Sequence, residues 1–213
     1  MDLLHLEAIA VERYERLGLD PCEPVNTCSL ARMMFRSKDD RTPIVTRPPS
    51  LLGDRPGAVW WKGETPFIAV RRTVPLELVG HVVGHEAAHL LLGRKHDGDP
   101  DLEAACDYLG ACLMAPRPAM LALHRAFGWE LGEIADEVVA TQTWAALRLG
   151  EALRVPLAAI SPVAVRVRGP EEWAWPDEPE LRRLSRRPKP GIKKVCITDQ
   201  RARCALICDE IAG

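Results

Sequence analysis

The feature that most constrains this chain is a pair of histidines four residues apart, inside a stretch with helical periodicity. Positions 85–89 read His-Glu-Ala-Ala-His between apolar flanks, and Gly93 is a suitable C-terminal stop. On a helix, residues at i and i+4 share one face, so both imidazoles can reach the same ion. Zinc accepts histidine nitrogens at about 2.0–2.1 Å, which this spacing allows. The sequence therefore predicts a helix ending near residue 92 that carries two metal ligands, His85 and His89.

Glu86 follows the first of these histidines, so its carboxylate flanks the ion without having to bind it. A general base for a zinc-activated water belongs at this position. In that mechanism zinc polarises the scissile carbonyl and lowers the pKa of the bound water. Glu86 accepts the water's proton and later delivers it to the leaving amine. We therefore expect Glu86 to be the catalytic residue of a peptide-bond hydrolase.

Two histidines do not complete a catalytic zinc site, which usually has three protein ligands and a water. Glu103 is the candidate third ligand, because it lies near the start of the next predicted helix, over residues 101–114. Asp107 is one turn further on the same face, where it can accept the free ring N–H of a ligating histidine. Alternatively, both acids have no role at a metal and only stabilise the helix, because negative side chains near its N-terminus interact favourably with the helix dipole.

Two segments of the chain resemble the ImmA/IrrE family of zinc metallopeptidases. The first is His-Glu-Ala-Ala-His-Leu-Leu-Leu at 85–92, and the second is Glu-Ala-Ala-Cys-Asp-Tyr-Leu-Gly-Ala-Cys-Leu-Met-Ala-Pro at 103–116. The family has a His-Glu-x-x-His helix and then a Glu-x-x-Ala-Asn/Asp-x-Phe-Ala-x-x-Leu-Leu-Met-Pro helix, and Glu103 matches its third zinc ligand. Cys106, Leu109 and Ala115 depart from that pattern, but no metal ligand and no base is lost.

The resemblance implies an intracellular endopeptidase with bound Zn²⁺ that cleaves a helix-turn-helix transcriptional repressor of the XRE type. Residues 1–57 lack a DNA-binding pattern, so we expect the repressor to be a separate protein. A hypothesis from another class is a zinc-stabilised regulatory module that binds a repressor or DNA without cutting. Glu86 argues against that hypothesis, since a structural site needs no base beside an open coordination position.

Composition places the chain among globular proteins and narrows its partners. Lys and Arg number 28 against 30 Asp and Glu in 213 residues, which excludes a polyanion binder that acts through overall charge. Seven cysteines form no Cys-x-x-Cys pair and suit a reducing compartment. The acidic first residues do not resemble a signal peptide, and no apolar run is long enough for a membrane helix. We therefore expect a cytoplasmic protein with no membrane partner.

The order of the patterns predicts an α+β fold in three parts. Residues 1–117 are the expected zincin-like core, with a small antiparallel sheet from strands near 58–61 and 67–70. An edge of this sheet is able to pair with an extended substrate, although the pattern does not say which strand is the edge. Residues 118–158 are an expected helical module. Residues 159–213 are an expected β-rich extension, with a strand at 163–168 and a hairpin over 194–208.

Two segments in the second half invite a DNA-binding interpretation. Residues 133–149 resemble a helix-turn-helix, but the second helix offers only Arg148 for phosphates, so a packing module is favoured over direct DNA binding. The basic run 182–194 follows an acidic stretch, and we interpret the two as a solvated loop whose charges compensate one another. Docking of that run to a partner or to DNA is the alternative.

Overall fold

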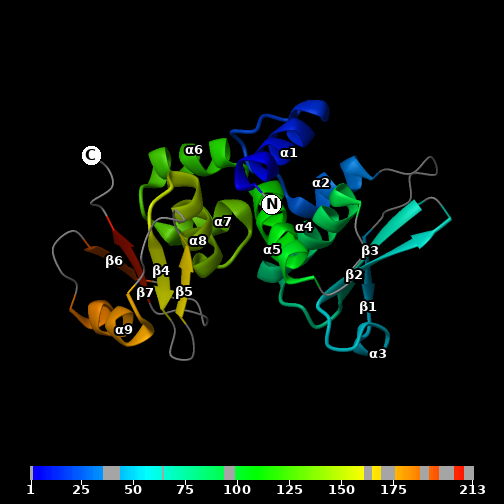
Figure 1. The fold of residues 1–213 in the computed structure, drawn as a ribbon. Helices are drawn as coiled ribbons and strands as arrows, with labels where there is room; N and C mark the ends of the chain where they lie inside the picture. Colours follow the sequence, from blue (N-terminus) through cyan, green and yellow to red (C-terminus); the bar gives the residue numbers. More distant parts are fainter. Residues whose placement is uncertain are drawn as a thin grey trace. The chain divides into compact units, whose positions relative to one another are not determined.

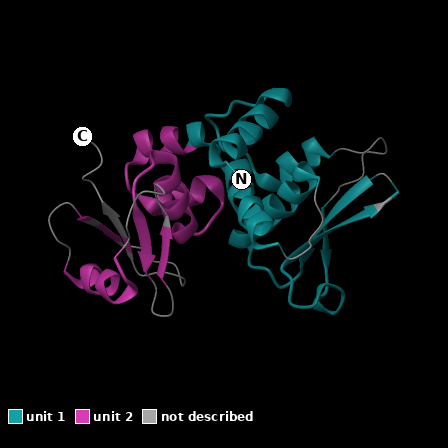
Figure 2. Cartoon of the chain, in the orientation of Figure 1, with its two compact units in different colours: residues 1–119 teal, residues 120–213 magenta. Residues whose placement is uncertain are grey.

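The computed structural model describes residues 2–35, 44–63, 65–93, 99–160, 165–168, 176–187, 192–196 and 204–208, and they form a mixed α and β fold (Figure 1). The chain divides into two compact units, Met1–Ala119 and Met120–Gly213 (Figure 2). This division lies close to the boundary predicted after residue 117. The predicted parts 118–158 and 159–213 fall almost wholly in the second unit, so the structure groups them together.

The first unit is built from helices on one small sheet. Its elements are α1 (Leu3–Arg16), α2 (Thr27–Met34), β1 (Ile44–Arg47), α3 (Pro49–Leu52), β2 (Gly57–Lys62), β3 (Thr65–Arg71), α4 (Leu76–Leu92) and α5 (Pro100–Met114). Along the chain, α6 (Arg117–Phe127) crosses the division between the units. The elements after it are α7 (Leu131–Val138), α8 (Gln142–Leu153), β4 (Leu157–Ile160), β5 (Val165–Arg168), α9 (Glu178–Arg186), β6 (Ile192–Cys196) and β7 (Cys204–Cys208).

The sheet of the first unit has the order β1-β3-β2, with β3 in the centre. β2 pairs antiparallel with β3 as predicted, but β1 pairs parallel with it, so the expected all-antiparallel sheet is wrong. The four residues of β1 lie in a stretch rich in Pro and Arg, and they are too few to show an alternating pattern. Pairing with β3, which is distant in sequence, defines this strand. α3 and β2 together form the crossover that a parallel pair requires.

Helix α4 lies between the sheet and α5 (Figure 1). It begins directly after Pro75 and ends at Gly93, whose left-handed φ of 64° lets its N–H bond the carbonyl of His89. The apolar side chains of α4 are buried on more than one side, in a core shared with β3, α1, α2 and α5. No helix among the described residues is both long and apolar enough to cross a membrane.

Two buried polar side chains of α1 hold α5 in place. The Tyr14 hydroxyl donates to the carbonyl of Leu113 at 3.0 Å and accepts the N–H of Val25 at 3.3 Å. Burial raises the pKa of Tyr14 to about 12 against the opposing effect of the Val25 bond, so the hydroxyl stays a donor. The Glu7 carboxylate accepts the Tyr108 hydroxyl at 3.0 Å and the Arg117 N–H at 3.3 Å. The C-terminal half of α5 and the residue that begins α6 are thus anchored to α1 by directional bonds.

The second unit places a four-stranded antiparallel sheet between two helices. The strand order is β5-β4-β7-β6, and the β6–β7 pairing confirms the predicted terminal hairpin, whose turn lies outside the described residues. Ala158 and Ile160 of β4 pack with Leu181 and Leu184 of α9. Leu157, on the opposite face of β4, packs closely against α8 at Gly150. Every residue of β4 is therefore buried.

The solvated loop predicted for the basic run 182–194 and the acidic stretch before it is wrong for the described residues, because 178–186 form helix α9 and 192–194 begin strand β6. Residues 171–175 and 188–191 lie outside the described part of the chain. The Asp177 side chain caps α9 by accepting the N–H of Glu180, and the two leucines of this helix cover the sheet. The charges do compensate one another, since Arg182 pairs with Glu178, and Arg183 with Glu180. The apolar spacing of only two leucines in a highly charged segment is too weak to show a helix in the sequence.

Candidate metal centre

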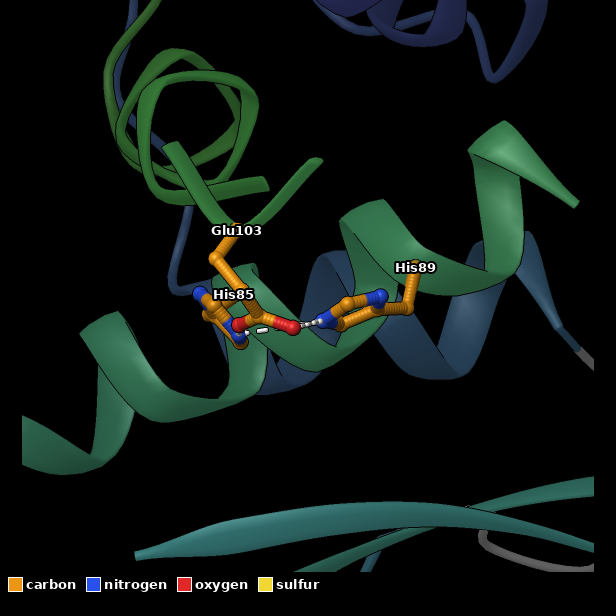
Figure 3. Close-up of side chains that lie close together, drawn as sticks. All are labelled: His85, His89 and Glu103. Atoms are coloured by element: carbon orange, nitrogen blue, oxygen red, sulfur yellow. Dashed lines mark hydrogen bonds and ion pairs between the residues drawn. The ribbon is translucent and has the colours of Figure 1, made fainter. Parts of the chain in front are cut away.

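His85, His89 and Glu103 form a group that could hold a metal ion, with all ligand atoms within 4.8 Å of one another (Figure 3). The two Nε2 atoms of the histidines are 3.1 Å apart. Glu103 reaches them from α5, with Oε2 3.2 Å from His85 Nε2 and Oε1 3.6 Å from His89 Nε2. The structure thus brings together the three side chains that the sequence predicts as ligands.

These distances fit a tetrahedral ion. Bonds of about 2.0–2.1 Å at tetrahedral angles separate neighbouring ligand atoms by roughly 3.3–3.4 Å. The two Nε2 atoms are 3.1 Å apart, and their contacts of 3.2 and 3.6 Å with the two different oxygens of Glu103 lie around that value. Two imidazole nitrogens and one carboxylate oxygen suit Zn²⁺, but the same donors also hold other divalent first-row ions. The geometry therefore shows a group that could hold a metal ion, without choosing the metal.

Asp107 orients the first histidine. Its Oδ1 accepts a hydrogen bond from Nδ1 of His85 at 2.8 Å, which leaves Nε2 of that ring to face the ligand group. Burial lowers the pKa of His85, but the bond to Asp107 and the charges of Asp107, Glu86 and Glu103 outweigh it and raise the pKa. The site thus carries surplus negative charge, which a bound cation would neutralise. Asp107 lies where the sequence predicts a residue that supports a ligand.

The site is closed on one side and open on the other. The side chain of His89 is 1% exposed, that of His85 17% and that of Glu103 35%. Exposure therefore rises from α4 towards the carboxylate of α5. A catalytic site needs an open coordination position, and a structural one does not. Glu103 is the most exposed of the three side chains.

A contact between two glycines, which the sequence analysis missed, brings the helices this close. A Cβ atom at Gly84 would lie 2.7 Å from the Gly110 carbonyl oxygen, and one at Gly110 would lie 2.7 Å from the His85 backbone nitrogen. The backbones of α4 and α5 therefore touch. Glu103 lies two turns before Gly110 on the same face of α5, and the crossing carries it to the histidines. Glycine inside two helical patterns was a usable indication, because it usually has a packing reason.

The Glu86 side chain on α4 is directed towards strand β2 of the sheet. It is 2% exposed, and its Oε1 would lie 2.9 Å from a Cβ atom at Gly57, the first residue of β2. A side chain at position 57 would therefore press on this carboxylate and on Val82. The negative charge of Glu86 is close enough to act on the pKa of His85. The candidate base thus lies between the ligand helix and strand β2.

Cys106, the residue before Asp107, is no ligand. It is fully buried, and burial raises its pKa to about 12, with a further contribution from the carboxylates of Glu103, Asp107 and Glu86. A thiol with this pKa is protonated near neutral pH, whereas metals bind thiolates. Its place on α5 is explained by packing, since it belongs to the core of the first unit.

The helix-turn-helix-like segment of the second unit has a buried second helix. No residue of α8 is exposed, and Arg148, its only candidate for a phosphate contact, is 1% exposed and pairs with Glu151 at 3.4 Å. A recognition helix must offer one face to a DNA groove. In this structure α8 has no such face, and it packs on α7 and on the sheet.

Comparison with known proteins informs the fold alone. No family model matches the chain, and no curated protein matches it. Among solved structures, a Mycobacterium tuberculosis transcriptional regulator is similar, with a TM-score of 0.60 and 6% sequence identity. The similarity covers 95% of this chain and 74% of that one. At this identity, the shared feature is a mixed α and β arrangement of the chain.

Proposed function

We propose that the first unit is a zincin-like, zinc-dependent endopeptidase, with Zn²⁺ bound by His85, His89 and Glu103. The observation that carries the proposal is the convergence of the three side chains: the two Nε2 atoms are 3.1 Å apart, and each lies within 3.6 Å of one oxygen of the Glu103 carboxylate. When bound, the ion would polarise a carbonyl and make water more acidic. A purely structural ion usually has four protein ligands, and three are found among the described residues.

The chain's own residues divide the remaining work. Glu86 accepts the proton of the attacking water on its carboxylate and delivers it to the nitrogen of the leaving amine. Gly57 leaves the space beside that carboxylate free of a side chain. Asp107 holds the ring of His85 in the orientation that a ligand needs. Each role belongs to a side chain that the helix crossing or the sheet keeps in place.

Strand β2 is the part of the core that would hold the substrate. It is one of the two edge strands in the order β1-β3-β2, and its first residue lies beside Glu86. A sheet edge binds an extended peptide through main-chain hydrogen bonds, whatever the side chains are. A peptide beside β2 would therefore run past the candidate base. This arrangement favours an endopeptidase that acts on an exposed, extended segment of another protein.

The substrate that we propose is a separate helix-turn-helix repressor, on the basis of the resemblance of residues 85–92 and 103–116 to the ImmA/IrrE family. The burial of α8 supports a protein rather than DNA as the direct partner, because that helix offers no face to a groove. Cleavage of the repressor would then relieve repression without any DNA contact by this chain.

The decisive test is Glu86→Gln in cells that also produce candidate repressors from the same genome. Glutamine keeps the size of the side chain but cannot accept the proton, while all three ligands remain. We expect normal folding, about one zinc per chain, and cleavage reduced by about 10²–10⁴-fold. Zinc content is measured on purified protein, and cleavage products are identified by mass spectrometry.

The control is the exposed acid Glu77→Gln, in the first turn of the same helix. We expect this variant to cleave like the wild type. A chelator should stop cleavage by the wild type, and added zinc should restore it. If target genes are still induced by Glu86→Gln with no cleavage product, the endopeptidase proposal is wrong and the binding-module hypothesis takes its place.

A further inference from the structure

The backbone of β2 presents alternate residues to its outer edge. The pairing Trp61↔Pro66 cannot use an N–H of Pro66, since proline has none, and at the other end Arg71 donates to the carbonyl of Pro56 at 2.8 Å. In an antiparallel ladder, hydrogen-bonded and non-hydrogen-bonded pairs alternate. The two ends of β2 therefore give the same assignment of hydrogen-bonded and non-hydrogen-bonded pairs. Gly57, Val59 and Trp61 direct their N–H and C=O groups away from β3, and no strand lies beyond β2 in the described part of the chain.

The same three residues share one face of the strand, because side chains alternate along it. Gly57 adjoins Glu86 and Val82 of α4, and Val59 packs against the core of the first unit. Trp61 is the third residue on this face, yet it is 56% exposed. At the Trp61 end of β2, the helices therefore leave the indole ring largely uncovered. The Gly57 end of the same edge lies beside the candidate base, Glu86.

The neighbouring residue, Trp60, is packed within the sheet, unlike the exposed Trp61. Trp60 lies on the other face, where its ring stacks on Phe67 with centroids 6.2 Å apart. The guanidinium carbon of Arg47 lies 5.3 Å from the centre of the Trp60 ring. Trp60 therefore has partners within the sheet, and its role in packing is accounted for. The contacts of Trp60 do not offset the unfavourable free energy of leaving the indole ring of Trp61 in water.

We infer that Trp61 is a specificity-determining residue that selects a large apolar side chain of an extended peptide bound along β2. This inference rests on the proposed endopeptidase. A peptide that bonds to the outward groups of Gly57, Val59 and Trp61 places its own paired side chains on the same face as theirs. The side chain opposite Trp61 would meet the exposed ring, and aromatic or aliphatic partners gain most there.

The spacing of the strand places this selection away from the scissile bond. Gly57 and Trp61 are four residues apart, which is about 13 Å in a strand. The carboxylate of Glu86 lies at the Gly57 end. The selected residue therefore lies about four positions from the bond that is cut. Trp61 acts on peptide binding and leaves the proton transfer at Glu86 unchanged.

The first experiment digests a mixed peptide library, made from a cell proteome, with zinc-loaded protein. For the wild type, we expect large apolar residues to be enriched at one position about four residues from the cut. Trp61→Ala should lose this enrichment, with kcat/KM for apolar peptides lowered about tenfold or more and that for peptides with glycine there unchanged. Trp61→Phe should keep the preference. Leu4→Ala is the control, since Leu4 is 58% exposed and lies on α1.

The second experiment measures binding without turnover. In the Glu86→Gln background, Trp61→Ala should weaken binding of an apolar library peptide about tenfold and leave its glycine counterpart unchanged. An unchanged preference and unchanged affinity in Trp61→Ala would overturn the inference while leaving the endopeptidase intact. Absence of any cleavage by the wild type would instead overturn the proposed function, and the inference with it.

Discussion

Each unit of this protein contains a pair of packed helices, and the two pairs serve different ends. In the first unit, α4 and α5 touch backbone to backbone at Gly84 and Gly110, and they carry three ligand side chains on a partly exposed side. In the second unit, α7 and α8 form the helix-turn-helix-like segment, and no residue of α8 is exposed. The first crossing gathers polar side chains that could hold a metal ion, whereas the second packs a helix into the core of its unit.

The buried charges of the two pairs differ in the same way. Arg148 of α8 is almost fully buried and pairs with Glu151 on its own helix, so both charges are compensated locally. At the metal centre, the carboxylates of Glu103, Asp107 and Glu86 raise the pKa of His85 and leave a negative surplus. Around Arg148 the opposite charge comes from the same helix, whereas three carboxylates lie near one histidine at the candidate metal centre. The comparison leads to three predictions about the helix pairs.

The largest difference between the α4–α5 pair and the α7–α8 pair should be in the effect of glutamate substitutions on zinc affinity. Glu103→Ala removes a ligand, so we expect zinc affinity to fall by at least the 10–100-fold seen when the surroundings of a metal are disturbed. Glu151→Ala removes a carboxylate from α8 and should leave zinc affinity unchanged. Competition with a chromophoric chelator measures both. Full affinity in Glu103→Ala would remove this residue from the site.

A smaller effect should distinguish the glycines of the two pairs. In Gly110→Ala, the new methyl group meets the backbone of His85 at 2.7 Å, so the helices must separate and Glu103 must move from the histidines. We expect zinc affinity to fall about tenfold and the free energy of unfolding to fall by about 1–3 kcal/mol. Zinc competition and denaturant unfolding of the metal-free protein measure the two effects.

Gly132→Ala in α7 is the matched control for the glycine contact. There a methyl group meets only the Gln142 side chain, at 3.5 Å, which is an ordinary contact. We expect unchanged zinc affinity and a gain in stability of about 0.5–1 kcal/mol from helix propensity. If Gly110→Ala and Gly132→Ala changed zinc affinity and the free energy of unfolding equally, the contact between Gly84 and Gly110 would not be what holds Glu103 near the histidines.

The smallest effect should be seen with DNA. Because α8 offers no exposed face, we expect this chain to bind DNA weakly, with a strong dependence on salt and no preference among sequences. Fluorescence anisotropy with several duplexes at two salt concentrations measures this. Tight binding to one sequence at physiological salt would show that the second helix pair does read DNA, and the contrast between the pairs would fail.

Local patterns predicted which side chains converge in the candidate metal centre, for a physical reason. Ligands on one helix are set by the 3.6-residue repeat, so His85 and His89 share a face wherever the helix packs. The strands at β2 and β3 were visible as short apolar runs around a turn. Strand β1 and helix α9 were missed, because each is defined by partners distant in sequence, β3 for one and the leucine contacts with the sheet for the other.

By itself, the sequence determined the two histidines, the neighbouring carboxylate and the acids one helix later, since each follows from spacing along a helix. Only the tertiary structure decided that Glu103 reaches the histidines, because the reach depends on a glycine contact between helices that no local pattern specifies. The tertiary structure also decided that β2 is an edge strand and that α8 has no exposed residue. Periodicity sets which residues share a face, but packing sets which faces meet and which remain open to a ligand.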